Sequence, residues 1–145
     1  MKALLQRVSH SSVTVNQQVV SSIGNGLLVL LGVENSDTVE NATALCKKIA
    51  NLRIFEDEQD RMNLSLLDIQ GEILVISQFT LMANTKKGNR PSFIDAAPPE
   101  RARPLIKSFC ETLAGYGLTV REGIFGAHMV VNLVNDGPVT IWLEN

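Results

Sequence analysis

The pattern of apolar and polar residues divides the first part of the chain into strands joined by short turns. Residues 2–8 predict a first strand, and residues 11–15 alternate polar and apolar side chains, as a half-exposed strand does. A polar turn then leads to a return strand at residues 19–23, which completes a predicted hairpin. The apolar run at residues 27–33 predicts a central strand that is covered on both faces.

Two stretches repeat apolar residues at helical spacing. The first predicts a helix over residues 38–51. Asp37 is its expected N-cap, because Glu40 follows three residues later at the spacing of a capping box. The second stretch predicts a helix over residues 100–114, although Pro104 lies inside it, where a proline costs about 3 kcal/mol.

The rest of the chain holds shorter strands and one long loop. The strands are expected at residues 54–55, 66–69, 119–122, 128–134 and 139–143. Residues 83–99 are rich in Asn, Gly, Ser and Pro and predict a loop of a length that is usually functional or disordered in a compact domain. Many strands and two helices predict a single α+β domain over residues 1–145: a curled, mostly antiparallel β-sheet or barrel with both helices on one side.

One strand ends in an unusual group of polar side chains. Residues 73–76 form a β-branched apolar run that predicts a buried strand. The motif that follows is Ser77-Gln78-Phe79-Thr80-Leu81. An unpaired buried hydroxyl or amide costs about 1–3 kcal/mol, so these side chains need partners. They either bond to neighbouring backbone, as at any strand end, or belong to a site.

A second unusual motif is Asn135-Asp136-Gly137-Pro138-Val139-Thr140. Taken alone, its Asn, Asp, Gly and Pro residues predict a tight hairpin turn. A Gly-Pro bond is also one at which the cis form costs only about 0.5–1 kcal/mol more than trans. A cis bond here would point two successive carbonyls in the same direction, and such a pair could probe the shape of a ligand.

Composition excludes several classes of protein. The chain is 45% hydrophobic and 19% charged, which argues against disorder, and no apolar run is long enough to span a membrane. Its net charge of −2 provides no global attraction to nucleic acid. Cys46 and Cys110 are isolated and no signal peptide is evident, so we expect a cytoplasmic protein with free, buried thiols. We expect no metal and no cofactor.

Together, the two motifs resemble the signatures of the D-aminoacyl-tRNA deacylases. The segments that also resemble that family are Leu5–Val8, Gly26–Val33, Arg53–Phe55, Met62–Leu64 and Arg90–Phe93. The resemblance implies a homodimer, with its sites at the interface, that hydrolyses the ester between a D-amino acid and the 3′-terminal adenosine of tRNA. It also implies hydrolysis of glycine mischarged on alanine tRNA, and a role in chirality proofreading.

The resemblance also implies roles for individual residues. The first motif, from Ser77 to Leu81, would line the pocket for the adenosine and the reacting carbonyl. Gly137 and Pro138, in the cis form and flanked by Val139 and Thr140, would reach into the partner's site and exclude the side chain of an L-amino acid. Arg7 would brace this loop. Rejecting a mirror image by a clash needs a rigid element, and a cis Gly-Pro turn is one.

The catalytic chemistry stays open between two schemes, with Thr80, Gln78 and Phe79 as the catalytic candidates. Thr80 is the evident nucleophile but has no clear base, because His10 and His128 are lone histidines, which are usually structural. Alternatively, backbone N–H groups near residues 78–80 bind the oxyanion, and the 2′-hydroxyl of the tRNA helps water to attack. We favour the second scheme, in which Thr80 positions the substrate.

Charge is unevenly distributed along the chain. Residues 84–107 carry six cations against two anions, and residues 34–60 carry seven anions against three cations. We therefore expect Lys86, Lys87 and Arg90 to contact tRNA phosphates, although a solvated face explains the same charges nearly as well.

Two other functions remain possible. One is an esterase or thioesterase for small molecules that uses Thr80 as its acyl nucleophile. The other is a non-catalytic, dimeric RNA-binding module, in which both motifs are only turns and strand ends.

Overall fold

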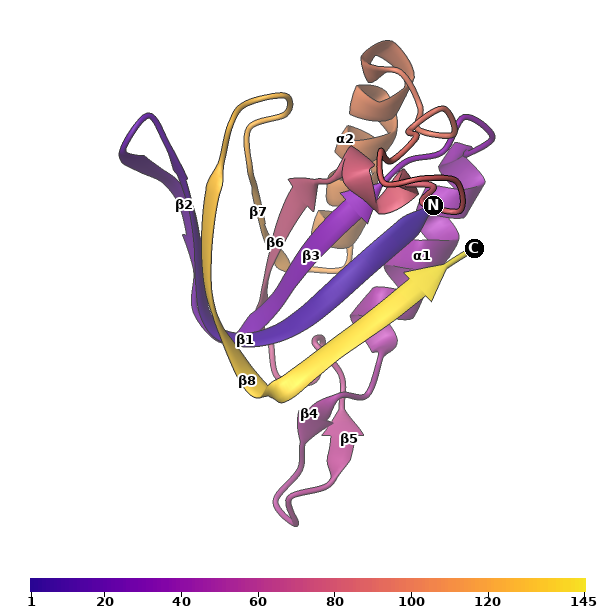
Figure 1. The fold of residues 1–145 in the computed structure, drawn as a ribbon. Coiled ribbons are helices and arrows are strands. Elements are labelled where there is room, and N and C mark those ends of the chain that lie inside the picture. The colour runs from indigo at the N-terminus through magenta and orange to yellow at the C-terminus, as the bar shows by residue number, and fades with distance from the viewer.

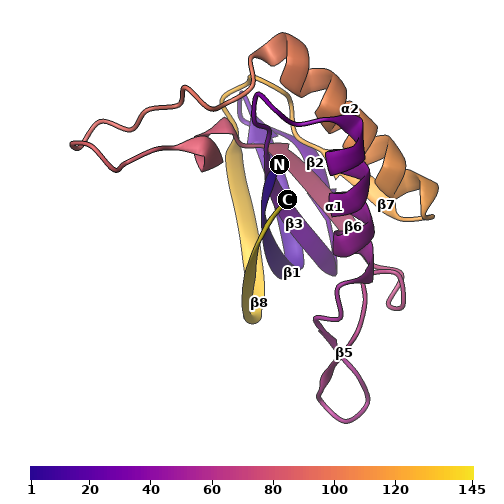
Figure 2. The same ribbon diagram turned by 90° about the vertical axis from the view of Figure 1, so that its right-hand side faces the viewer.

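A computed structural model describes residues 1–145, and in it a curled sheet packs against two helices that lie on the same side (Figures 1 and 2). The strands are β1 (Lys2–Val15), β2 (Gln18–Ile23), β3 (Gly26–Gly32), β4 (Phe55–Glu56), β5 (Met62–Leu64), β6 (Glu72–Ser77), β7 (Thr119–Glu122) and β8 (Val130–Glu144). The helices are α1 (Val39–Asn51), α2 (Pro99–Gly115) and the short 3₁₀ helix η1 (Phe79–Met82). This arrangement confirms the predicted α+β class.

Strand β1 is a long, bent strand that pairs with three others. Its first half pairs antiparallel with β3, from Lys2 to Val8, and its second half pairs antiparallel with β2, from Ser11 to Val15. Strand β8 follows the opposite edge of β1 along nearly its whole length (Figure 1). The two separate strands expected over residues 2–15 are therefore one strand, and the predicted hairpin with β2 is confirmed.

One side of the sheet is parallel. Its strand order is β2-β1-β3-β6-β7, and β6 runs parallel to both β3 and β7. Helix α1 lies in the connection from β3 to β6, and α2 in the connection from β6 to β7. Parallel strands are buried on both faces, which explains the unbroken apolar runs in β3 and β6. Their carboxyl ends meet at one edge of the sheet, where η1 begins.

The main core lies between the sheet and the two helices. Phe109 and Leu113 of α2 and Ile49 of α1 are fully buried there. Cys46 and Cys110 are free and buried, as predicted. Burial raises the pKa of the Cys46 thiol to about 12 and also raises the pKa of Cys110, so both thiols stay protonated.

Helix α1 is capped by Thr38, so the prediction of Asp37 as the N-cap is wrong. Thr38 Oγ1 accepts from Asn41 N at 3.4 Å, and Asn41 Oδ1 accepts from Thr38 N at 3.0 Å, which forms a capping box. The Asp37 carboxylate instead binds the Met1 ammonium at 2.5 Å. A full positive charge is a stronger partner for a buried carboxylate than helix N–H groups.

Helix α2 begins at Pro99 and keeps Pro104 inside it. Pro104 is exposed and lies close to the start of the helix, so the carbonyl that loses its donor, that of Glu100, can be hydrated. None of the helices is both long and apolar enough to cross a membrane.

The strand expected at residues 66–69 is wrong. Strand β5 lies earlier and pairs with β4, while residues 66–69 form a turn. Ser65 N and Ser65 Oγ donate to Asp68 Oδ2 at 2.8 and 2.7 Å, and these bonds lower the pKa of Asp68. Leu66 is fully buried, so its apolar character reflects one anchoring side chain instead of a strand.

The second motif is a bulge within β8, so the expected hairpin between strands at 128–134 and 139–143 is wrong. Both halves of β8 run antiparallel to β1. Gln6 pairs with Thr140 and Val8 with Asn135, so two steps along β1 correspond to five along β8. The three extra residues protrude from the sheet. Within them, the Gly137–Pro138 peptide bond is cis.

The loop between η1 and α2 is present as predicted. A single bridge between Asn84 and Ser92 closes its outer part. Figure 2 shows this segment projecting from the body of the molecule, away from the helices.

Candidate functional site

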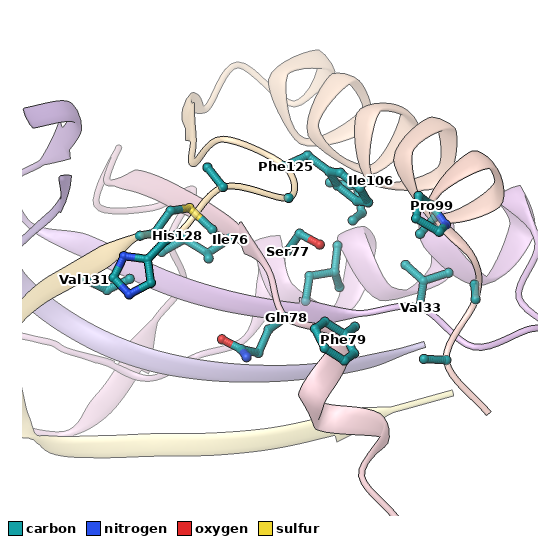
Figure 3. Close-up of a pocket in the computed structure, with 17 residues that line it drawn as sticks. Val33, Ile76, Ser77, Gln78, Phe79, Pro99, Ile106, Phe125, His128 and Val131 are labelled. Carbon is teal, nitrogen blue, oxygen red and sulfur yellow. The ribbon is translucent and has the colours of Figure 1, made fainter. Parts of the chain in front are cut away.

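A cavity of about 600 Å³ opens at the carboxyl ends of β3 and β6. Its walls come from these two strands, the start of α2 and the loop of residues 123–129 (Figure 3). Twelve of its 17 lining residues are hydrophobic. The polar side chains among them are Ser77, Gln78 and His128. An apolar cavity with a few polar groups is typical of a site for a small organic group.

The first motif supplies one end of the cavity. Gln78 N donates to Leu31 O at 2.8 Å, which extends the pairing of β6 with β3 and fixes the backbone where the strand ends. Phe79 is 56% exposed and packs edge-on against Phe93, with ring centroids 5.1 Å apart. Ser77, Gln78 and Phe79 line the cavity. An aromatic surface and two polar groups therefore face the same space.

Thr80 and Leu81 lie one step further on, in η1, and do not line the cavity. The Thr80 hydroxyl has one hydrogen bond, which it accepts from Gln78 Nε2. An amide N–H cannot take up a proton, so this contact orients the hydroxyl without activating it as a nucleophile.

Neither histidine is hydrogen-bonded to the Thr80 hydroxyl. His128 lines the cavity and is its one ionisable side chain, whereas His10 is an exposed residue of β1 that pairs with Val134. No group of three or more His, Cys, Asp and Glu side chains is placed to hold a metal ion.

Sequence reasoning missed the far wall of the cavity. Phe125, Met129 and Val131 line it, together with Pro99 and Ile106 from α2 (Figure 3). These side chains are apolar and distant from the motif in sequence, so they read as ordinary core residues. In the sequence, the one local sign of this wall is the bend flanked by Gly123 and Gly126.

The second motif is held firmly by Arg7, which is 4% exposed. Arg7 Nε donates to Asp136 O at 3.1 Å, and its terminal nitrogens donate to Ile54 O at 2.8 Å and to Glu56 Oε1 at 3.3 Å. Gly137 has φ +126°, and a Cβ there would lie 2.7 Å from Val139 Cγ2 and 3.1 Å from Arg7. The position therefore requires glycine.

Asn135 closes the bulge from the other side. Its Oδ1 accepts from Val139 N at 3.0 Å, and its Nδ2 donates to Thr140 Oγ1 at 3.0 Å. Val139 is buried, while Gly137 and Pro138 are exposed at the tip. The tip of the bulge is therefore a fixed backbone projection.

Within one chain, the two motifs lie far apart. Gln78 is bonded to Leu31, which pairs with Ala3 of β1, whereas the bulge lies between Gln6 and Val8 on the other edge of β1. Strand spacings place them on the order of 20 Å apart. The single chain does not bring the two motifs together, so a site that combines them across a dimer interface, as the sequence predicts, stays a prediction.

The three basic residues that we expect to contact tRNA phosphates lie outside both motifs. Lys86, Lys87 and Arg90 are exposed on the projecting loop, and none of them forms an ion pair. This loop carries Phe93 at its base, so it is connected to the cavity through the contact of Phe93 with Phe79.

Comparison with known proteins identifies a matching family, close relatives and similar solved structures. The model of the family described as D-Tyr-tRNA(Tyr) deacylase matches residues 4–144. A relative named D-aminoacyl-tRNA deacylase from Thermomicrobium roseum is 60% identical over 145 residues, which cover 100% of this chain and 94% of the relative.

Two solved structures are similar over almost their full length. One, described as a c-Myc DNA unwinding element binding protein, has a TM-score of 0.94 and 46% identity, and the match covers 100% of this chain and 99% of that one. The other, described as a probable eukaryotic D-amino acid tRNA deacylase, has a TM-score of 0.85 at 18% identity, with 98% and 97% covered. The second likeness shows the fold alone.

Replacing Arg7 with lysine should destabilise the protein by about 2–3 kcal/mol, because one ammonium cannot reach the three separate acceptors that the guanidinium serves. Arg61→Lys is the matched control, since Arg61 is exposed and contacts only residues of its own turn. Its effect should be below about 1 kcal/mol. Urea unfolding of both variants measures the difference, and equal stabilities would show that Arg7 does not hold the bulge.

Proposed function

The chain belongs to the D-Tyr-tRNA(Tyr) deacylase family and is a hydrolase of the ester bond of D-aminoacyl-tRNA, and we propose that its cavity receives the 3′-terminal adenosine of the charged tRNA. The observation that carries this proposal is the placement of Ser77, Gln78 and Phe79 in an apolar cavity at the ends of two parallel strands. Apolar and aromatic walls suit a nucleobase, and the polar groups suit a ribose and an ester.

In this proposal the enzyme supplies little acid–base chemistry. The first N–H groups of a helical turn have no partner within it, so the N–H groups of Phe79 and Thr80 at the start of η1 can bind the oxyanion. The 2′-hydroxyl of the terminal ribose then helps the attacking water, and Thr80 positions the substrate. The absence of a base at the Thr80 hydroxyl supports this scheme over one in which Thr80 attacks.

Selection between enantiomers comes from the bulge of a second subunit. Enantiomers carry the same groups, so attractive contacts separate them poorly, and a rigid obstacle separates them well. The tip at Gly137 and Pro138, held by Arg7 and Asn135, suits that task. Because this tip lies far from the cavity of its own chain, a partner has to supply it. D-amino acids and glycine then fit, and L side chains clash with the tip.

The outer face of β8 is the proposed dimer interface. Its side chains Val130, Val134 and Trp142 are 52%, 57% and 45% exposed, although they are large and apolar. Only one edge of β8 is paired within the chain. A two-fold axis across this face would bring each bulge towards the partner's cavity, because an isologous interface makes the same contact twice.

The projecting loop is proposed to contact the acceptor end of the tRNA. Lys86, Lys87 and Arg90 are exposed cations without intramolecular partners, so they are available to phosphates. A tRNA ester as substrate also favours a cytoplasmic location. Release of glycine mischarged on alanine tRNA follows from the same geometry, since glycine has no side chain to clash.

Incubation with D-Tyr-tRNA and L-Tyr-tRNA tests the function directly. In the presence of EDTA, we expect release from the D ester at least about 100-fold faster than from the L ester, corresponding to about 2.7 kcal/mol of discrimination. Equal release would contradict chiral selection. Turnover of a small tyrosine ester at the same rate would indicate a general esterase, and RNA binding without release would indicate a binding module.

Thr80→Ala and Thr80→Val separate the two chemical schemes under single-turnover conditions. If Thr80 only positions the substrate, each variant should slow D-Tyr-tRNA hydrolysis by no more than about tenfold, equivalent to one lost hydrogen bond. A terminal 2′-deoxyadenosine should slow the wild-type enzyme further. Thr43→Ala on α1 is the control, because its hydroxyl bonds only to Val39 O. Activity at background in both Thr80 variants would assign the nucleophile to Thr80.

Val134→Glu tests the dimer. We expect the wild type to sediment at twice the mass of one chain, and the variant to sediment as a monomer that has lost its preference for the D ester. Val39→Glu is the matched control, because Val39 is an equally apolar residue that is 51% exposed on α1 and is not part of β8. A monomeric wild type that still selects the D ester would refute the role of the partner's bulge.

A further inference from the structure

The loop of residues 123–129 forms one wall of the cavity but is weakly attached to the sheet. Gly123 N donates to Val75 O at 3.0 Å, and the only other backbone hydrogen bond of the loop is internal, from Ala127 N to Ile124 O at 3.1 Å. Between Gly123 and the start of β8, the position of this wall therefore depends on side-chain contacts.

Arg103 of α2 supplies such a contact. Its guanidinium carbon lies 4.7 Å from the centroid of the Phe125 ring, within the range of a cation–π interaction. Phe125 also lines the cavity and packs against the main core, beside Ile106 of the same helix (Figure 3). Arg103 forms no ion pair with any acid, so the ring is its one specific partner.

We infer that Arg103 is a positioning residue for the terminal nucleoside: it holds Phe125 in place and so sets the width of the cavity. This inference rests on the proposed function, which places adenosine in the cavity. A nucleobase stacks favourably on an aromatic ring, and a ring that is already held in place loses less conformational freedom when the base binds. Arg103 therefore affects binding without touching the ligand.

The alternative role for an exposed arginine beside this cavity is a direct contact with a tRNA phosphate. The two roles differ in one respect. A role through the ring requires Phe125, whereas a phosphate contact does not. A double-mutant cycle between Arg103 and Phe125 separates them, because residues that act through each other are not additive.

The experiment measures binding of adenosine 5′-monophosphate by calorimetry, and KM and kcat on D-Tyr-tRNA, for a set of surface variants. Arg103→Met keeps the aliphatic stem and removes the cation. It should raise the dissociation constant and KM by about two- to five-fold and leave kcat within twofold. Arg103→Lys keeps a cation over the ring and should restore most of the affinity. Arg101→Met removes an equal charge two residues away and should change neither constant.

In a Phe125→Leu background, Arg103→Met should have no further effect. An equal loss in both backgrounds, together with a reduced salt dependence of KM, would instead show a phosphate contact and overturn the inference. An unchanged affinity for the monophosphate in Arg103→Met, or no binding to the wild type, would overturn it as well.

The same measurements test the proposed function and this inference separately. If the wild type binds the monophosphate and responds to Arg103→Met, but releases no amino acid from D-Tyr-tRNA, the positioning role stands and the proposed function fails. Thermal unfolding of each variant shows whether a loss of affinity comes from a loss of folded protein.

Discussion

The structure depends on the pairing of β1 along both of its edges. One edge is shared between β3 and β2, and the other is covered by β8, so a single bent strand aligns three others. The parallel strands β6 and β7 are then added beside β3, and the two helices cover one side. Arg7 lies in this bent strand, and its buried guanidinium connects the bulge of β8 to the segment that follows α1. The positions of both motifs follow from this one strand.

The local pattern of apolar and polar residues was sufficient to predict most helices and strands. It failed where a partner distant in sequence determines the local structure. The apolar runs of β3 and β6 and the helical repeats of α1 and α2 could be located from the chain alone, because burial on a face leaves a period in the sequence. Asp37 looked like a cap, but the ammonium of Met1, 36 residues away in sequence, binds it instead. The motif around Gly137 looked like a hairpin, but β1 pairs with both of its flanks and makes it a bulge.

The same distinction applies to the site. Ser77 and Gln78 could be identified because polar side chains at the end of a buried strand are unusual, and both line the cavity. Phe125 could not be identified, since an apolar residue in a bend reads as core until the fold places it opposite the motif. Grouping Gly137 with Thr80 came from the family resemblance alone. Within a single chain, β1 and β3 lie between the strands that carry these two motifs, so joining them in one site requires a second chain.

The bulge in β8 also governs how this strand can align. A β-strand that slips by one residue turns every side chain to the opposite face, which would expose Ile141 and Leu143 and bury Trp142. To slip, β8 would have to carry its three protruding residues past the fixed guanidinium of Arg7. The bulge that projects Gly137 and Pro138 from the sheet thus also prevents β1 and β8, the longest strand pair, from shifting in register.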